Sequence, residues 1–309
     1  MCIRDSFINS SKKVLERVEK ITGVKPLCHE IDVCDVGALR TLFSEHKFDA
    51  VIHFAGLKAV GESVQEPLLY YNNNVSGALT LFQVMQEYDC YRLVFSSSAT
   101  VYGDPASVPI SEDFPLKVTN PYGQSKLMIE NILRDLSVAN ENWQISILRY
   151  FNPVSAHPSG LIGESPNGIP NNLMPYIAQV AVGKRKQLTV FGDDYPTLDG
   201  TGVRDYIHVV DLVNAHIKAL LALSPGHACQ AYNIGTGQGY SVLQMIKAFE
   251  KASQRSVPYV IEKRRSGDIA ECFALPDLSR ERLGWSAEYG LDRMMEDHWR
   301  WQSQNPDGY

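Results

Sequence analysis

The residues best suited to chemistry lie between Ser96 and Lys126. An apolar run, Arg92-Leu-Val-Phe95, leads into Ser96-Ser-Ser-Ala-Thr-Val-Tyr-Gly103, and Asn120-Pro-Tyr-Gly-Gln-Ser-Lys126 is typical of the start of a helix. Residues four apart share one face of a helix, so Tyr122 and Lys126 are expected one turn apart. A strand end can carry Ser98 toward them. An ammonium beside a phenol favours the phenolate, and a nearby hydroxyl relays or orients the proton, so the trio predicts acid–base catalysis by Tyr122.

Lowering the pKa of Tyr122 is the demanding part of this chemistry. Moving a tyrosine from its reference pKa near 10 to about 7 takes roughly 4 kcal/mol. One lysine is not expected to supply all of that free energy, so a second positive charge is expected nearby. The Tyr-x-x-x-Lys spacing alone is weak, because amphipathic helices contain it by chance. Its position after a buried-looking strand, with Pro121 in the first helical turn, makes it more specific.

The elements that must position these residues alternate between strands and helices. We expect a helix over 12–20, a strand over 27–33, a helix capped by Asp35 and running to 45, and a strand over 49–55. A long helix over 63–88 precedes the strand that ends near Ser98, and a further strand covers 144–151. Met1 to Ser6 forms neither a convincing buried strand nor a glycine loop. The alternation predicts an α/β fold with a doubly wound, Rossmann-type, mostly parallel sheet.

The second half of the chain differs in composition, because it contains loops rich in Pro, Gly and Asn. We expect helices over 173–182, 242–252 and 291–302, and strands over 188–191 and 259–262. Tyr232-Asn-Ile-Gly235 is typical of a strand that returns to the main sheet. We therefore predict a sheet domain over 1–153 and a smaller α/β substrate-binding domain over 154–309, with 205–237 returning to the sheet.

Composition narrows the partners and the location. The chain has 309 residues, 44% hydrophobic content and a net charge of −6, which argue for a globular chain and against nucleic acid as a partner. No apolar run nears the roughly 18 residues of a membrane helix, and no signal peptide is readable, so we expect no membrane partner and a cytoplasmic location. The six cysteines lack metal-type spacing and are expected to be reduced thiols, with no metal bound.

Several stretches resemble one known family. Together with Phe95 to Gly103, they resemble the extended short-chain dehydrogenase/reductases, and within these the UDP-glucose 4-epimerase family, over nearly the whole chain from about Asp5 onward. The matching stretches are His53-Phe-Ala-Gly-Leu-Lys-Ala-Val-Gly-Glu-Ser63, Leu148-Arg-Tyr-Phe-Asn-Pro153, Gly168-Ile-Pro-Asn-Asn-Leu-Met-Pro175 and Gly200-Thr-Gly-Val-Arg-Asp-Tyr-Ile-His208.

The resemblance implies an activity and an assembly. It implies that UDP-glucose and UDP-galactose interconvert through a transient 4-keto sugar, with NAD retained as the cofactor and as the source of the second positive charge. Tyr122 would be the base, Lys126 would keep it acidic, and Ser98 would relay or orient the proton. A homodimer through the long helices near 63–88 and 122–139 is implied as well. Cys272 stands where some members carry Tyr, so UDP-N-acetylhexosamines are also expected as substrates.

The resemblance further implies a set of NAD contacts. Asn73 is a poor helix former inside a predicted helix, which independently favours a functional role. No Gly-x-x-Gly-x-x-Gly turn for a pyrophosphate occurs in the sequence, so about one β-α unit is expected to be missing before Asp5, which would cost the chain solubility, bound NAD and activity. Besides the catalytic trio, the implied cofactor residues are Asp5, Asp32, Val33, Phe54, Ala55, Gly56, Lys58, Asn73 and Phe151.

A second set of residues is expected to hold the UDP-sugar. The free N–H groups at a helix beginning after Asn171-Asn172 make a natural diphosphate site, although a plain Asn cap explains the same residues. Arg204 and Arg265 carry guanidinium groups that suit phosphate oxygens. The full set is Asn152, Asn172, Leu173, Phe191, Arg204, Arg265, Asp268 and Cys272.

Two other functions compete with epimerisation. Nucleotide-sugar dehydratases carry an Asp-Glu pair directly after the catalytic Ser or Thr, and decarboxylases carry Glu at the second position; this chain has Ala99 and Thr100 there. The required acid is absent, which argues against both. A non-catalytic or inactive nucleotide-binding protein on the same fold is the other alternative. The intact trio argues against it, and the missing glycine turn argues for it.

Overall fold

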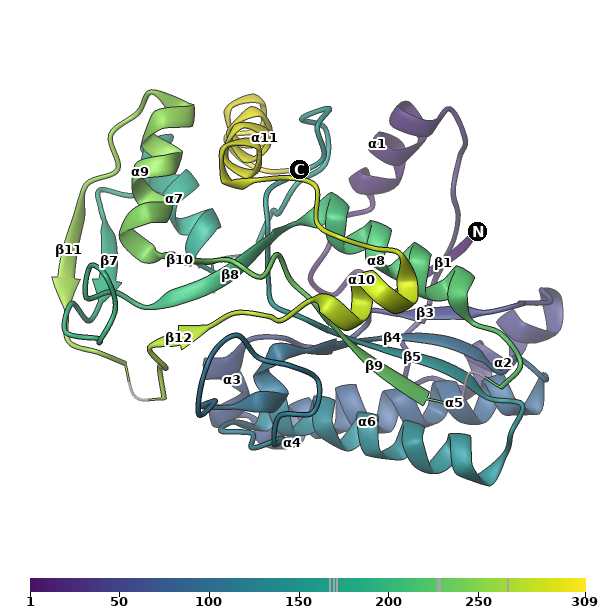
Figure 1. Ribbon diagram of the computed structural model, residues 1–309. Coiled ribbons are helices and arrows are strands. Elements are labelled where there is room, and N and C mark those ends of the chain that lie inside the picture. The colour runs from purple at the N-terminus through teal and green to yellow at the C-terminus, as the bar shows by residue number, and fades with distance from the viewer. Residues whose placement is uncertain (167, 169, 171, 227–228, 266) are drawn as a thin grey trace.

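The main sheet of the computed structural model has four parallel strands. They are β3 (Val51–His53), β4 (Arg92–Ser98), β5 (Gln144–Tyr150) and β9 (Cys229–Ile234), in the order β3-β4-β5-β9. Helices α5 (Gly77–Glu87) and α6 (Pro121–Ala139) lie on one face, and α8 (Val209–Ala222) lies on the other (Figure 1). This arrangement confirms the predicted α/β fold. The structure describes residues 1–166, 168, 170, 172–226, 229–265 and 267–309.

Apolar residues of β4 pack on both faces of this sheet. Leu93 and Phe95 belong to one buried cluster with Ile129 and Leu133 of α6. Val94 belongs to another, with Leu212 and Ala215 of α8. A strand covered on both faces needs an unbroken apolar run, and this explains the sequence that precedes Ser96.

Helix α6 begins at Pro121, as its sequence predicts. The side chain of Asn120 accepts a hydrogen bond from the backbone N–H of Gly123 at 2.9 Å, and Pro121 occupies the first turn. Tyr122, Lys126 and Glu130 follow at intervals of four residues, and all three are buried. The helix therefore presents one polar stripe to the sheet.

A second, smaller sheet holds the first two strands. β1 (Cys2–Asp5) pairs in parallel with β2 (Leu27–Glu30), and α1 (Lys13–Thr22) connects them. Within the described residues no ladder joins β1 to β3. Residues 1–6 thus contain a strand that the sequence did not suggest, and β2 ends three residues before the predicted Val33. Helix α2 (Val36–Glu45) has the predicted cap, because the Asp35 carboxylate accepts from the Ala38 N–H at 2.9 Å.

The single long helix predicted over 63–88 is wrong. The structure has α3 (Val60–Gln65), α4 (Pro67–Tyr70), a π-helical segment (Tyr71–Ser76) and then α5. Pro67 lacks an N–H and cannot continue α3. The buried Asn74 side chain hydrogen-bonds outside the helix, to both backbone groups of Leu57, and the wider π turn accommodates it.

The second half forms smaller sheets beside the main one. β8 (Val203–His208) pairs with β6 (Asn152–Val154), β10 (Gly239–Ser241) and β12 (Glu271–Cys272), while β7 (Leu188–Phe191) pairs with β11 (Tyr259–Glu262). Helices α7 (Leu173–Ala181), α9 (Val242–Ser253) and α11 (Leu291–Gln304) pack around one apolar cluster, and α10 (Asp277–Leu283) lies near α8. β9 returns to pair with β5, as predicted for Tyr232 to Gly235. The domain division at residue 153 stays a prediction.

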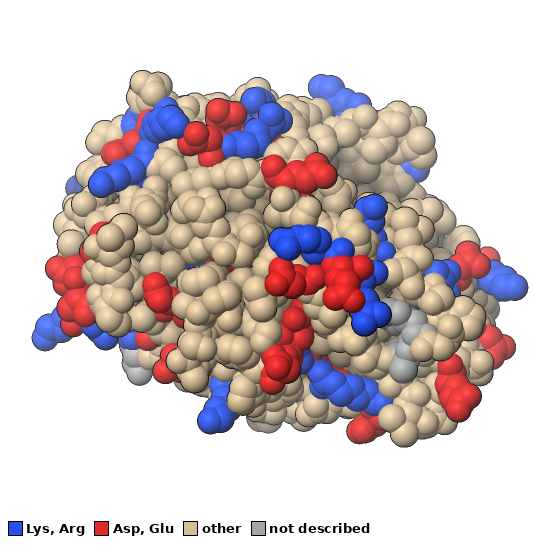
Figure 2. Space-filling view, in the orientation of Figure 1, with Lys and Arg blue, Asp and Glu red and all other residues tan. Residues whose placement is uncertain are grey.

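The surface carries mixed charge. Figure 2 shows lysine and arginine side chains interspersed with aspartate and glutamate on the face in view. Among the described residues, no helix is both long enough and apolar enough to span a bilayer.

Candidate active site

The predicted trio comes together at the carboxyl end of β4. Ser98 is the last residue of that strand, and Ser98, Tyr122 and Lys126 are all buried. The side chains of Ser98 and Tyr150 lie close enough to the Tyr122 phenol to lower its pKa. The Lys126 ammonium donates to the backbone carbonyl of Ser96 at 2.9 Å and lies 4.9 Å from the centre of the Phe95 ring.

Burial dominates the electrostatics of Tyr122 and Lys126. Burial raises the pKa of Tyr122 above its ordinary value, and the neighbouring Ser98 and Tyr150 side chains lower this pKa only in part. Burial lowers the pKa of Lys126 to about 8, while the negative charge of Glu130 raises it. The expected acidification of Tyr122 by Lys126 stays a prediction. A phenol in a low-dielectric site resists ionisation until another charge offsets that cost.

The loop after β3 meets the trio at Gly56. A Cβ atom placed on Gly56 would lie 3.2 Å from Asn74 Oδ1 and 3.6 Å from Lys126 Nζ, so the backbone approaches both closely. The Asn74 amide donates to the Leu57 carbonyl at 3.0 Å and to Ser125 Oγ at 3.1 Å. Asn73, the residue predicted to contact the cofactor, donates to Asn74 Oδ1 at 2.9 Å. Asn74 therefore fixes this loop against α6, a role that the sequence did not reveal.

The other residues of this loop point to different neighbours. The Phe54 side chain is 52% exposed, and its ring packs on His216 with the centroids 4.5 Å apart. Ala55 is half-buried between Phe54 and Gly56. The Lys58 ammonium lies 3.5 Å from the Glu164 carboxylate. An exposed aromatic ring next to a small residue leaves a surface on which a flat ligand can stack.

Two carboxylates, Asp5 and Asp32, lie at the carboxyl ends of the strands in the small sheet. Asp5 accepts from the Phe7 N–H at 2.7 Å and from Ser10 Oγ at 3.3 Å, and Asp32 accepts from the Cys34 N–H at 2.8 Å. Arg4 lies near both carboxylates, and Val33 is buried next to Asp32. Asp5 and Asp32 thus share Arg4 as a charged neighbour. Their contacts with NAD stay a prediction.

Phe151 and Cys272 lie in one buried cluster with Ala99, directly beside the end of β4. Cys272 is also the strand partner of Arg204, whose guanidinium donates to the Val203 carbonyl at 2.8 Å. The exposed Asn152 begins β6 one residue after Phe151. Predicted cofactor and substrate residues therefore meet at this point.

A second group of predicted substrate residues forms around Phe191. The Arg265 guanidinium lies 4.7 Å from the centre of the Phe191 ring and donates to both carboxylate oxygens of Asp268, at 2.9 and 3.3 Å. Arg204 and the buried Tyr195 are close enough to interact electrostatically. Within the described residues the Tyr195 hydroxyl has no hydrogen-bond partner.

Asn172 lies at the N-terminus of α7, as predicted, but its side chain does not cap the helix. Its amide donates to the Glu164 carboxylate at 3.0 Å, the same carboxylate that pairs with Lys58. Leu173 is half-buried against the cluster around α7. Ile169 and Asn171, from the same sequence motif, lie outside the described residues.

Comparison with known proteins identifies the family. The family model for GDP-mannose 4,6 dehydratase matches residues 4–298. The UDP-glucose 4-epimerase of Bacillus subtilis is 59% identical over 307 residues, which cover 99% of this chain and 91% of that protein. The chain belongs to the UDP-glucose 4-epimerase family.

Other relatives and solved structures agree. The Homo sapiens UDP-glucose 4-epimerase is 57% identical over 296 residues, covering 96% of this chain and 85% of that protein. The Bifidobacterium longum UDP-glucose 4-epimerase, solved with NAD+ and UDP, matches with a TM-score of 0.96 and 52% identity over 100% of this chain and 92% of that chain. A Campylobacter jejuni UDP-Glc/GlcNAc 4-epimerase matches with a TM-score of 0.84 and 35% identity over 98% and 91%.

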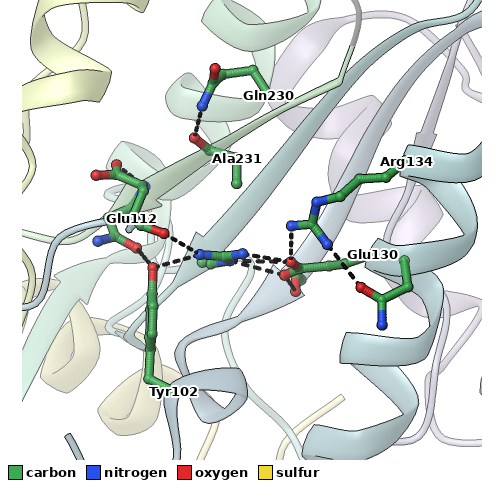
Figure 3. A network of polar contacts seen from close by, with 10 residues as sticks. Tyr102, Glu112, Glu130, Arg134, Gln230 and Ala231 are labelled. Carbon is green, nitrogen blue, oxygen red and sulfur yellow. Dashed lines mark hydrogen bonds and ion pairs between the residues drawn. The ribbon is translucent and has the colours of Figure 1, made fainter. Parts of the chain in front are cut away.

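The polar network beneath the catalytic trio is a feature of this epimerase-family chain that sequence reasoning missed. Glu130 accepts from Ser97 Oγ at 2.6 Å, from the Arg149 guanidinium at 2.7 and 3.0 Å, and from Arg134 at 2.8 Å. Figure 3 shows Glu130 and Arg134 in this network, with Tyr102 on its other side. Glu130 lies one turn after Lys126, so the network fixes α6 against β4 and β5.

Asp205 provides a similar anchor on the substrate side. It is fully buried and accepts from Thr236 Oγ1 at 2.6 Å and from the backbone N–H groups of Thr236, Gly237 and Ala274 at 2.9, 3.0 and 3.1 Å. These bonds tie β8, which carries Arg204, to two neighbouring segments. The sequence contains Asp205 within a quoted motif, but only the fold shows what it holds.

Proposed function

We propose that this chain is an NAD-dependent UDP-glucose 4-epimerase, which interconverts UDP-glucose and UDP-galactose. The observation that carries the proposal is that Ser98, Tyr122 and Lys126 are buried at the carboxyl end of a parallel sheet. A parallel α/β sheet places its ligands at that edge. Membership of the epimerase family supports the same reaction.

The residues present fit NAD at both ends of the dinucleotide. Asp5 and Asp32 offer carboxylates to ribose hydroxyls and the adenine at the ends of β1 and β2, with Val33 beside them. Gly56 lies near Lys126, and Phe151 shares a buried cluster with Ala99, the residue after Ser98. Phe54, Ala55, Lys58 and Asn73 complete this set. NAD, when bound, supplies a reversible hydride acceptor for the sugar C4 and a positive charge next to Tyr122.

The chain's own groups move and hold the proton. Tyr122, as phenolate, takes the proton of the sugar 4-hydroxyl, and Ser98 orients that transfer. The same tyrosine returns the proton after the 4-keto sugar has presented its other face. Lys126 holds a positive charge within the site, and this charge favours the phenolate once the site is filled.

The substrate residues are suited to anchor the diphosphate and the uridine rather than the sugar. Arg204 and Arg265 offer guanidinium groups to the diphosphate, Asn172 marks the N-terminus of α7, and Phe191 with Asp268 borders Arg265. Asn152 and Leu173 complete the set. Anchoring away from the reacting carbon leaves the sugar free to rotate, as epimerisation requires.

The test is to incubate the purified chain with NAD and UDP-galactose and to identify the product by NMR and mass spectrometry. UDP-glucose of unchanged mass is the expected product. A product that has lost water would contradict epimerisation and indicate a dehydratase, although Ala99 and Thr100 lack the required acid. NAD and UDP-sugar binding without turnover would instead identify a non-catalytic nucleotide-binding protein.

We also propose that UDP-N-acetylglucosamine is a substrate. Cys272 is small and buried beside Phe151 and Ala99, where a larger side chain would narrow the space for the sugar. Cys272→Tyr should lower turnover of the acetylated sugar more than that of UDP-glucose, while Cys229→Ala serves as the control. An unchanged ratio of the two rates would show that Cys272 is not the gate.

We further propose a homodimer in the cytoplasm. Val64, Leu68 and Leu79, on α3, α4 and α5, are exposed apolar residues, as are Met128 and Val138 on α6. These helices lie on one side of the main sheet (Figure 1). All six cysteines are free, which suits a reducing compartment. Replacing Leu68 and Val138 by Glu should produce monomers in sedimentation, whereas Leu221→Glu on α8 should not. Unchanged dimers in the double variant would contradict this interface.

A further inference from the structure

Asn74 lies between two parts of the candidate site. It belongs to the π-helical segment, and its side chain bonds both to the loop after β3 and to the first turns of α6. Asn74 is 2% exposed, and its partner Ser125 on α6 is fully buried. π-helical turns next to α-helices are frequent at functional sites. Asn74 is therefore placed to act on the cofactor loop and on the catalytic helix together.

The Asn74 carboxamide uses its full hydrogen-bonding capacity of two acceptor sites and two donor hydrogens. Oδ1 accepts from the Leu57 N–H at 2.8 Å and from the Asn73 amide at 2.9 Å. Nδ2 donates to the Leu57 carbonyl at 3.0 Å and to Ser125 Oγ at 3.1 Å. Ser125 Oγ in turn donates to the Tyr122 carbonyl at 2.7 Å. A continuous chain of hydrogen bonds thus joins the loop at Leu57 to the backbone of Tyr122.

The loop that Asn74 holds covers the Lys126 ammonium. A Cβ atom on Gly56 would lie only 3.6 Å from Lys126 Nζ, which leaves little room for water between the loop backbone and the ammonium. The Ser96 carbonyl and the Phe95 ring lie against the same ammonium. Charges interact more strongly where water is excluded. The position of the loop therefore affects how strongly Lys126 acts on its neighbours.

We propose that Asn74 is a positioning residue that clamps the loop from Phe54 to Lys58 over Lys126 and so keeps water away from this ammonium. This proposal rests on the proposed function, in which the Lys126 charge favours the Tyr122 phenolate. Exclusion of water lets that single charge act in a low dielectric. The same carboxamide orients Asn73, one of the implied cofactor residues.

The direct test follows Lys126 in the chain without added ligand. Protein labelled with ¹³C at the lysine Cε is titrated by NMR, and the Lys126 signal is assigned by its loss in Lys126→Met. Burial lowers the pKa of Lys126 from its ordinary 10.5 to about 8. Asn74→Ala should release the loop and admit water, so the Lys126 midpoint should rise by about one to two pH units. An unchanged or lower midpoint would overturn the proposal.

The other titratable groups near Lys126 stay the same in this variant. The Glu130 carboxylate raises the pKa of Lys126, and burial lowers the pKa of His53 on β3 to about 3, so His53 is neutral throughout the titration. Asn72→Ala is the matched control, because Asn72 lies in the same π-helical segment but is exposed. It should leave the Lys126 midpoint unchanged. Equal shifts in both variants would contradict a specific clamp by Asn74.

A milder variant keeps the test decisive if Asn74→Ala does not fold. Ser125→Ala leaves the bonds of Asn74 to Leu57 and Asn73 in place and removes only the bond to α6. Loss of one hydrogen bond should raise the Lys126 midpoint by about half a pH unit. An unchanged midpoint in this variant would overturn the clamp as well.

Hydrogen exchange shows whether the effect is local. In Asn74→Ala, peptides covering residues 54–58 should exchange faster, while those covering β4 and β5 should keep their rates. Faster exchange over the whole chain would indicate a general loss of stability and contradict a local clamp. Asn72→Ala should change none of these rates.

Kinetics separate this inference from the proposed function. With NAD and UDP-galactose, Asn74→Ala should lower kcat by roughly 10- to 100-fold, because the groups around Tyr122 are no longer held in place. The KM for UDP-galactose should stay the same, since Arg204 and Arg265 lie elsewhere. A rise in KM with unchanged kcat would contradict the proposal. If the unmodified chain shows no epimerase activity, the proposed function fails, while the Lys126 titration still decides the role of Asn74.

Discussion

β4 and β1 are both parallel strands that end in a polar residue of the candidate site, yet their surroundings differ. From Leu93 to Ser98 every residue of β4 is buried, whereas β1 and its partner β2 contain no fully buried residue, and neither does α1 between them. Ser98 is therefore held by a packed sheet with helices on both faces. Asp5 is held by local bonds to Phe7 and Ser10 near the surface.

This difference suits two different tasks. Acid–base chemistry needs a fixed geometry and a low dielectric, which the packed sheet gives to Tyr122. Carboxylates that meet ribose hydroxyls need access to solvent and a ligand more than they need burial. The contrast predicts that changes near β4 alter turnover and global stability, while changes near β1 alter local order.

The largest expected effect is that of Tyr122→Phe. The substitution keeps the ring but removes the proton acceptor, so kcat should fall by about 100- to 10,000-fold. Asp5→Asn, at the end of β1, should instead weaken NAD binding by roughly 10- to 100-fold, because it removes hydrogen bonds to a charged group. Steady-state kinetics and an NAD titration measure both. A Tyr122→Phe variant with near-normal kcat would refute its assignment as the base.

Next in size is the contrast between two ion pairs. Glu130→Gln leaves Arg149 buried without its counter-charge, which should cost about 3–5 kcal/mol of unfolding free energy. Glu30, which pairs with Lys12 across the surface of the small sheet, is the matched site, and Glu30→Gln should cost about 0–1 kcal/mol. Urea denaturation gives both values. Equal losses of unfolding free energy in the two variants would contradict the contrast between the buried main sheet and the exposed small sheet.

Sequence and structure agree where local chemistry decides the outcome. Asp35 caps α2 as expected, α6 begins after Asn120 as expected, and β7 and β11 have the predicted bounds. The trio was predictable because its spacing reflects a helical turn. Glu130 was missed because its role depends on helix-to-sheet packing, which periodicity does not encode. The π segment was missed because it depends on the bonds of Asn74 to the distant residue Leu57. These bonds override the α-helical pattern of the surrounding sequence.

A third contrast concerns pH. His216 of α8 is buried behind β4, where it bonds to Ser96 Oγ at 2.6 Å, and burial lowers its pKa to about 4. The unfolded chain then binds more protons than the folded chain below the ordinary value of 6.5, so stability falls as the pH drops from 6.5 toward 4. The loss from this residue should approach about 3 kcal/mol.

Thermal unfolding at a series of pH values checks this expectation. His216→Gln should be less stable than the unmodified chain at neutral pH but should show a flatter decline below pH 6.5, the ordinary histidine value. Replacement of His157, an exposed-loop residue that bonds to Ser159, serves as the control and should leave the slope unchanged. An identical slope in His216→Gln would show that another group governs the acid response.

The smallest effect on global stability is expected at Arg17, which ties the small sheet to the rest of the molecule. Its guanidinium lies 5.4 Å from the Trp301 ring and 4.9 Å from the Tyr309 ring, and it donates to the Leu161 carbonyl at 2.8 Å and to Asn305 Oδ1 at 2.6 Å. Arg17→Lys keeps the charge but loses the planar fork that makes these contacts together. Because α1 buries none of its residues, this half-buried arginine carries much of its attachment.

Hydrogen exchange followed by mass spectrometry is the measurement that resolves this attachment. In Arg17→Lys, peptides covering β1 and β2 should exchange faster, while those covering β4 and β5 should keep their rates and the global unfolding free energy should fall by less than about 1 kcal/mol. Arg280→Lys, in an exposed pair with Asp277 on α10, is the control and should change neither sheet. Faster exchange in both sheets would mean that they open as one cooperative unit, because local opening of β1 and β2 alone leaves the backbone bonds between β4 and β5 intact.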